Sequence, residues 1–204
     1  GYGADPVTCL ELVHDTCLYI VQGNHDEMAA ADDRPENFNA WAEQAVMWTR
    51  ERLGPDQRRW LGALPLTIRP EPDLLVVHGS PARPERWYYL ELLVYAREAF
   101  GVVEDGVCFV GHTHRPWTYR MRDGDITGHD LGEHDLDPDA RYLFNPGSVG
   151  QPRDRDPRAA YAVYDTTTRR IELHRVAYDI DTAMSKIRSA GLPGYLASRL
   201  SSGR

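Results

Sequence analysis

The chain has 204 residues, of which 42% are hydrophobic, and it carries a formal net charge of −8 at pH 7. This length and apolar content suffice for a domain with its own core, and we expect a single domain over residues 1–204. No stretch is long and apolar enough to predict a membrane helix, and the acidic balance argues against a broad surface for duplex nucleic acid.

Patterns in the first third of the chain predict three helices and one strand. The Asp-Pro pair at residues 5–6 is typical of a helix start, and apolar residues at helical spacing predict a second helix over about residues 38–53, with its tryptophans in the core. A third helix begins at the Gly-Pro pair of residues 54–55. Before the second helix, residues 18–21 form an apolar run that predicts a short buried strand, and this strand ends at the motif GNHD (residues 23–26).

The rest of the chain is richer in strands. In chain order we expect strands at 66–69 and 74–77, a helix at 85–100, strands at 107–110, 117–122 and 141–144, a hairpin of 160–164 with 171–176, and a last helix that Asp181 caps and Gly191 ends. Residues 123–139 are acidic and are expected to form a solvated loop. Their aspartates lack the glycine and glutamate positions of an EF-hand loop, which argues against calcium.

Four of the predicted strands end in short polar motifs: GNHD (23–26), HGS (78–80), GHTH (111–114) and NPGS (145–148). Ligands of α/β sheets bind beyond the carboxyl ends of strands, where loops converge. One such motif alone is explained by a glycine turn with a surface histidine, but four in this order predict a single polar pocket. Histidine is also the commonest nitrogen ligand for divalent transition metals, and the two histidines of the third motif can share one concave space.

Together with the residues that follow to Arg153, these motifs resemble the calcineurin-like metallophosphoesterases, in particular the small prokaryotic branch of phosphodiesterases and diadenosine-tetraphosphatase-like proteins. The resemblance extends from Gly1 to about Leu200. It implies a four-layer α-β-β-α sandwich, with two mixed β-sheets flanked by helices. It also implies metal-dependent hydrolysis of phosphodiesters or phosphomonoesters, nucleotides among them, by a dinuclear site with a metal-activated hydroxide.

The resemblance also implies roles for single residues. Asn24, His78 and His112 would bind one metal ion, and His114 would bind the other. His25 would lie beside the scissile phosphate as a general acid or transition-state donor. A complete protein would hold two divalent ions, with Mn, Fe, Zn, Ni and Co all compatible with such ligands.

Two arginines are candidates for substrate contact. Arg153 follows the fourth motif and is either a phosphate contact or a member of a surface salt bridge. Arg83 belongs, with Arg86, to a segment whose aromatic residues 87–89 either stack on a nucleotide or aryl phosphate or pack beneath a loop.

The sequence departs from the family pattern at its start. It contains no D-x-H, and its one G-D pair, Gly124-Asp125, lies in a predicted hairpin turn and does not replace the bridging aspartate. Residues 1–6 resemble the family segment that follows that aspartate, so a strand, helix and strand are expected to be missing. A chain that truly lacks them should bind one metal ion or none and hydrolyse esters poorly.

The motifs favour an enzyme over two alternatives. A non-catalytic or weakly active metal-binding scaffold on the same fold would have lost ligands, and all four motif ligands are present. A nucleic-acid-binding module needs a basic stripe or a stacking platform, for which this acidic chain gives no sign. Three cysteines without C-x-x-C spacing indicate a reduced, cytoplasmic protein. We therefore expect a small phosphate ester as the partner, with no membrane and no stable nucleic-acid partner.

Overall fold

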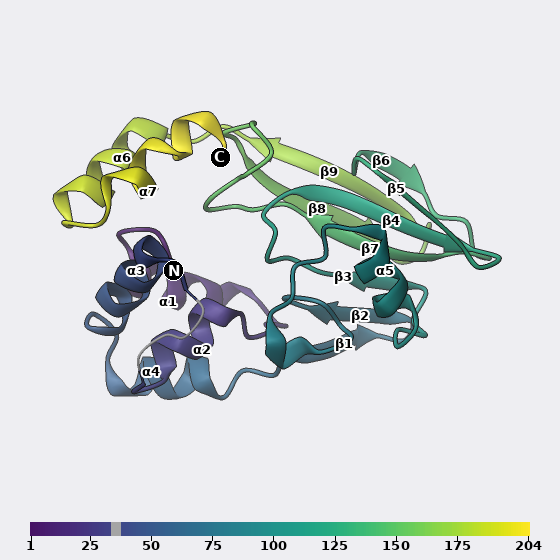
Figure 1. Cartoon of the computed structure of the whole chain (residues 1–204), viewed down its shortest axis with the longest axis horizontal. Helices are drawn as coiled ribbons and strands as arrows, with labels where there is room; N and C mark the ends of the chain where they lie inside the picture. The colour runs from purple at the N-terminus through teal and green to yellow at the C-terminus, as the bar shows by residue number, and fades with distance from the viewer. Residues whose placement is uncertain (34–37) are drawn as a thin grey trace.

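The computed structural model describes residues 1–33 and 38–204 (Figure 1). As predicted, two β-sheets flanked by helices form the fold. The larger sheet has six strands in the order β1-β2-β3-β7-β4-β5, and the smaller has three in the order β6-β9-β8. Among these residues, none of the helices is both long enough and apolar enough to cross a membrane.

Three neighbouring strands of the larger sheet run parallel and carry the motifs at their ends. The six strands are β1 (Thr67–Glu71), β2 (Leu74–Val77), β3 (Val107–Phe109), β4 (Pro116–Arg122), β5 (Asp125–His129) and β7 (Arg141–Pro146). Strands β2, β3 and β7 are mutually parallel, and the other pairings are antiparallel. The smaller sheet is an antiparallel set of β6 (Glu133–Asp135), β8 (Ala159–Asp165) and β9 (Arg170–Val176). Parallel strands have a common carboxyl edge, and this edge positions the site.

The helices start and end largely where local sequence chemistry places them. In chain order they are α1 (Pro6–Thr16), α2 (Asn24–Ala30), α3 (Ala40–Arg50), α4 (Pro55–Gly62), the 3-10 helix η1 (Pro84–Arg86), α5 (Leu93–Phe100), α6 (Ile180–Ser189), α7 (Gly194–Ser198) and the 3-10 helix η2 (Leu200–Ser202). The side chain of Asn39 caps α3 by accepting from the Ala42 N–H, and Gln57 accepts from the Gly54 N–H at the start of α4.

Successive side chains of the parallel strands point to opposite faces of the sheet, so the core has two layers. Val107 and Phe144 face the smaller sheet, where they pack with Ile171 of β9. Their neighbours Cys108 and Leu143 face the opposite side and pack with α5. Because both faces of these strands are buried, they read as continuous apolar runs in the sequence.

Two predictions for the first third of the chain are wrong. Residues 18–21 form no strand, and Leu18 is 84% exposed, because no strand among the described residues pairs with them. The motif GNHD consequently begins helix α2 instead of ending a strand: the Asp26 carboxylate accepts the Gly23 N–H. The prediction that the tryptophans of α3 belong to the core is also wrong for Trp41, which is 48% exposed and stacks on Tyr195.

Three later boundaries also differ. The helix expected at 85–100 starts only at Leu93, because Trp87 has a left-handed backbone (φ 55°) that ends η1. Beyond β5, the partner strand of the predicted hairpin, the acidic segment 123–139 also holds strand β6, where a loop was expected. The last helix is capped by Asp179, whose carboxylate accepts the Thr182 N–H, and not by Asp181.

Candidate metal and phosphate site

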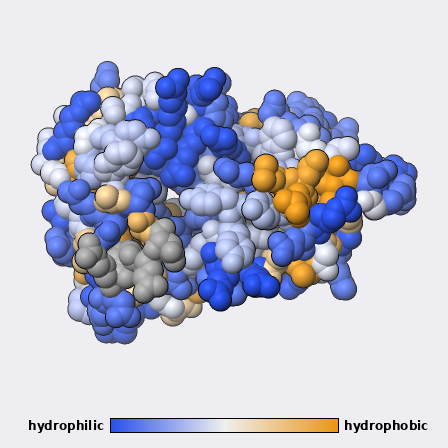
Figure 2. Space-filling model, viewed as in Figure 1, coloured by the Kyte–Doolittle hydropathy of each residue, from blue (hydrophilic) through white to orange (hydrophobic). Residues whose placement is uncertain are grey.

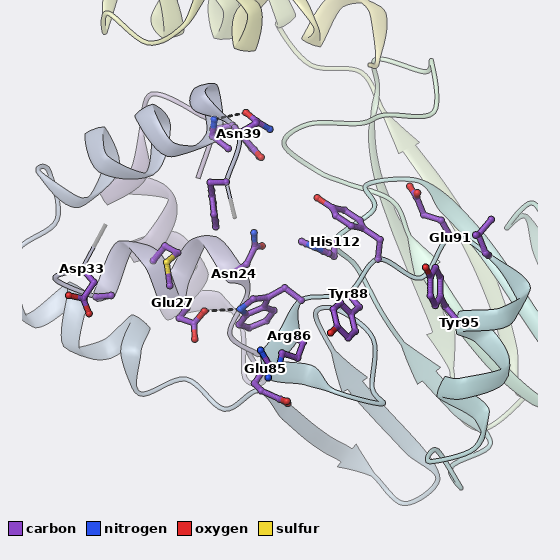
Figure 3. Close-up of a pocket in the computed structure, with 18 of the residues that line it drawn as sticks. Asn24, Glu27, Asp33, Asn39, Glu85, Arg86, Tyr88, Glu91, Tyr95 and His112 are labelled. Carbon is purple, nitrogen blue, oxygen red and sulfur yellow. Dashed lines mark hydrogen bonds between the residues drawn. The ribbon is translucent and has the colours of Figure 1, made fainter. Parts of the chain in front are cut away.

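Three of the predicted ligands meet at the carboxyl edge of the parallel strands. His78 follows β2, His112 follows β3, and Asn24 reaches the same place from the first turn of α2. The His78 Nε2 lies 3.2 Å from the Asn24 Oδ1 and 3.2 Å from the His112 Nδ1. Figure 3 shows Asn24 and His112 on opposite sides of one space. We call these three residues the ligand cluster.

The ligand cluster fits a divalent metal ion in spacing and protonation. Ligands about 2.0–2.1 Å from an ion lie roughly 3 Å apart in a tetrahedral or octahedral shell, close to the 3.2 Å seen here. Burial lowers the pKa of His78 to about 4 and, with the nearby His78 ring, that of His112 to about 3. Both rings are therefore neutral at pH 7 and have a nitrogen lone pair. The third donor is an amide, and the described residues hold no metal-like group of three or more His, Cys, Asp or Glu.

His114 lies apart from the ligand cluster but is held firmly. Its Nδ1 donates to the Gln151 carbonyl oxygen at 2.7 Å, which leaves Nε2 as the free ring nitrogen. Burial, followed by the positive charge of Arg153, lowers the pKa of His114 to about 3. Among the described residues, no hydrogen bond joins His114 to the ligand cluster.

The Asn145 side chain holds the loop that carries His112 and His114. Its Nδ2 donates to the Gly111 carbonyl oxygen at 2.7 Å and to the Thr113 Oγ1 at 2.9 Å, and its Oδ1 accepts the Gly147 N–H. His112 and His114 both have left-handed backbones, with φ of 65° and 61°. Such conformations cost free energy for residues other than glycine and persist only where surrounding contacts impose them. The NPGS motif thus forms a structural turn, and the sequence analysis missed this role of the asparagine side chain.

His25 is the second residue of α2 and is largely buried. Its ring lies 4.4 Å from the ring of Tyr2 and 5.0 Å from that of Phe38. The Nδ1 atom is buried and has no hydrogen-bond partner among the described residues. Burial, reinforced by neighbouring positive charges, holds the pKa of His25 well below 6.5, so the ring is neutral at pH 7.

The two candidate arginines have different surroundings. The guanidinium of Arg153 donates to the Gln151 Oε1 at 2.8 and 3.2 Å and lies 5.7 Å from the ring of Tyr2. No carboxylate pairs with it within the part of the chain that the structure describes, which argues against the salt-bridge alternative. Arg83 is exposed and does not line the cavity at the site, whereas Arg86 does.

A cavity of about 1500 Å³ opens beside the ligand cluster (Figure 3). Asn24 and His112 form part of its wall. Trp87 and Tyr88, for which stacking and packing beneath a loop were both open, line it as well, and Tyr88 is 48% exposed. The cavity leads from the ligand cluster to solvent and has room for far more than one phosphate group.

Comparison with known proteins gives concordant results. The model of the calcineurin-like phosphoesterase superfamily domain matches residues 4–169. An uncharacterised protein of Methanocaldococcus jannaschii is 38% identical over 208 residues, an alignment that covers 100% of this chain and 83% of that protein.

Solved structures agree with this match. A metallophosphoesterase from Sphaerobacter thermophilus superposes with a TM-score of 0.87 at 37% identity, over 100% of this chain and 84% of that one. A hypothetical protein from Pyrococcus horikoshii OT3, at 20% identity, shares the fold with a TM-score of 0.77, over 100% of this chain and 82% of that one. Members of the matched family are metal-dependent hydrolases of phosphate esters. The chain belongs to the calcineurin-like phosphoesterase superfamily.

Proposed function

We propose that this protein hydrolyses small phosphate esters at the carboxyl edge of β2, β3 and β7. The observation that carries the proposal is the convergence of Asn24, His78 and His112, three donors from three separate elements, at 3.2 Å spacing. At this spacing the three groups can share hydrogen bonds with one another, and with their lone pairs turned inward they would together hold one divalent ion.

In this proposal the ligand cluster holds one divalent ion and His114 belongs to a second position. Bound ions such as manganese, iron, zinc, nickel or cobalt would supply Lewis acidity that polarises the phosphoryl group and lowers the pKa of an attacking water. The depressed pKa values of His78 and His112 keep one nitrogen of each ring free of a proton at neutral pH. The hydrogen bond from His114 to Gln151 fixes the orientation of that ring and its free nitrogen.

His25 and Arg153 complete the proposed site from the chain's own residues. The lowered pKa of His25 favours the role of a neutral N–H donor to a phosphoryl or leaving-group oxygen over that of a full general acid. Arg153, held by Gln151 and unpaired with any described carboxylate, supplies positive charge for the phosphate. Arg83 does not line the cavity, and no contact within the described residues supports a role for it in binding.

The test compares metal content with turnover in two variants. We expect His112→Ala to lose at least half of its bound metal by elemental mass spectrometry. We expect His25→Ala to keep its metal while turnover of bis(p-nitrophenyl) phosphate falls about 100-fold, in line with the loss of one positioned donor. The partly exposed His174 on β9 provides the control His174→Ala, which should match the wild type in both measurements.

The predictions for His112→Ala and His25→Ala can be contradicted independently of each other. Full metal occupancy in His112→Ala would remove it from the ligands, and wild-type turnover in His25→Ala would exclude its role as donor. Circular dichroism on each variant separates these outcomes from loss of fold.

A weakly active metal-binding scaffold is the second candidate. It is favoured by one observation: the described residues hold no group of three or more His, Cys, Asp or Glu placed to bind a metal ion. Metal binding without turnover in the wild type would support the scaffold and exclude the enzyme.

A further inference from the structure

The cavity beside the ligand cluster is larger than a phosphate group requires. Its volume of about 1500 Å³ exceeds the roughly 300–1,000 Å³ of most small-molecule pockets. Because Asn24 and His112 line its inner end, a phosphate held at the ligand cluster would extend its organic group into this space. The chemistry of the cavity walls therefore determines which organic group binds well.

Aromatic rings form one wall and begin directly at the ligand cluster. The ring of Tyr89 stacks on His112 with centroids 4.0 Å apart and planes tilted by 19°. The indole of Trp87 meets the His78 ring edge-on at 5.9 Å, and its Nε1 donates to the Glu27 Oε2 at 2.7 Å across the cavity mouth from α2. These contacts fix two aromatic rings directly beside the ligand cluster.

The apolar surface continues outward along the segment that leads into α5. Figure 2 shows a hydrophobic patch over this part of the molecule. The large apolar residues exposed there are Tyr88, Tyr89, Leu92, Leu93, Val94 and Tyr95. Six such residues within eight positions are unusual for a free surface, since burying apolar area is favourable. Tyr88, Tyr89, Leu92 and Tyr95 also line the cavity, which links the patch to the site.

The charges in the cavity are nearly all negative. The described lining residues include five carboxylates, Glu27, Asp33, Glu85, Glu91 and Glu98, and their only basic side chain is Arg86. A second phosphate in this space would therefore face carboxylates at short range, whereas an uncharged or cationic group would not. Carboxylates beside aromatic faces also suit a cationic substituent.

We propose that the preferred substrate carries a single phosphate whose alcohol is a bulky apolar or aromatic group without negative charge. This inference rests on the proposed function and narrows its substrate class. It excludes dinucleoside polyphosphates as preferred substrates, because their further phosphates would lie among the carboxylates of the cavity.

The test uses four p-nitrophenyl phosphodiesters that differ only in the second alcohol: methyl, phenyl, 4-carboxyphenyl and 4-(trimethylammonio)phenyl. In each reaction water adds to phosphorus and p-nitrophenolate leaves, so each kcat/KM can be divided by the uncatalysed rate of the same ester. We expect the phenyl ester to exceed the methyl ester at least 10-fold. The carboxyphenyl ester should be at least 10-fold poorer than the phenyl ester, and the trimethylammonio ester equal to it or better.

Variants test whether the cavity carboxylates cause the discrimination. The double substitution Glu85→Gln with Glu98→Gln should reduce the ratio of phenyl to carboxyphenyl kcat/KM at least 3-fold. Glu51→Gln, which removes an exposed carboxylate outside the cavity, should leave the ratio unchanged.

The outcomes separate the two proposals. Equal rates for all four esters, or a preference for the carboxyphenyl ester, would overturn this inference and leave the proposed function standing. Hydrolysis of none of them, with metal bound, would overturn both.

Discussion

At the scale of single residues, Asn145 holds two loops of the site together. It is 4% exposed and joins the loops after β3 and β7 through three hydrogen bonds. These bonds impose the left-handed backbone at His112 and His114, and so they determine where the proposed ligands point. We treat Asn145 as a positioning residue, because it acts through those histidines and not on the substrate.

Asn145→Ala should therefore weaken both the fold and the proposed metal site. The change leaves a buried carbonyl, hydroxyl and N–H without their partner, which we expect to cost about 2–4 kcal/mol of unfolding free energy. Urea unfolding and metal titration measure the two effects, and metal affinity should fall at least 10-fold. Asp179→Ala removes the cap of α6 as the control, with a cost of about 1 kcal/mol and no change in metal affinity. Unaltered metal affinity in Asn145→Ala would exclude the positioning role.

The residues that could be predicted from sequence are those whose role follows from a strand end. His78 and His112 follow apolar runs, and the parallel order of β2 and β3 brings them together as expected. The bonds of Asn145 could not be predicted, because they span 32 and 34 positions and depend on strand order. An asparagine directly before a Pro-Gly turn was the available signal.

At the scale of elements, predictions are correct where turn and cap residues determine the structure. They are wrong where the structure depends on contacts with distant parts of the chain. The helix start at Pro55 and the β4–β5 hairpin depend on turn and cap residues and are confirmed. Residues 18–21 have a strand-like composition, but no strand in the described part of the chain lies beside them, and burial in a sheet requires one. The helix at 85–100 was shortened by the backbone of Trp87, which no periodicity reveals.

Strand β7 offers an energetic test of the two-sheet core. Phe144 is fully buried, stacks on Tyr142 at 5.3 Å and packs against the smaller sheet. Phe144→Ala should lower the free energy of unfolding by about 3–5 kcal/mol, because it leaves a cavity between the sheets. Val163→Ala, at a half-exposed position of β8, should cost less than about 1 kcal/mol. Similar urea midpoints for the two variants would contradict this assignment of the core.

At the scale of the whole molecule, the buried histidines link stability to pH. His78, His112 and His114 have folded pKa values of about 4, 3 and 3, and that of His25 is also lowered. Between about pH 6.5 and these values the unfolded chain binds more protons than the folded one. Stability is therefore fully present above pH 6.5 and falls as the pH decreases, by up to about 1.4 kcal/mol per histidine per pH unit.

Urea unfolding of chelator-treated protein at pH 7, 6 and 5 measures this slope. We expect a clear loss of stability from pH 6.5 to pH 5 and a shallower loss in the double variant His78→Gln, His112→Gln. His14→Gln, at an exposed position of α1, is the control and should keep the wild-type slope. A free energy of unfolding that is constant from pH 7 to pH 5 would contradict the assignment of neutral, buried rings.

The left-handed backbone at positions 112 and 114 restricts how this site can change over evolution. Glycine, asparagine and aspartate tolerate such a conformation, whereas threonine, valine and isoleucine do so poorly. Most single-nucleotide changes of a histidine codon, those to leucine or proline for example, meet two barriers: loss of the proposed metal ligand and the cost of the left-handed backbone. Drift at these two positions should be narrow, with asparagine or aspartate as the accessible substitutes, and each of them would still present an oxygen in place of the imidazole nitrogen.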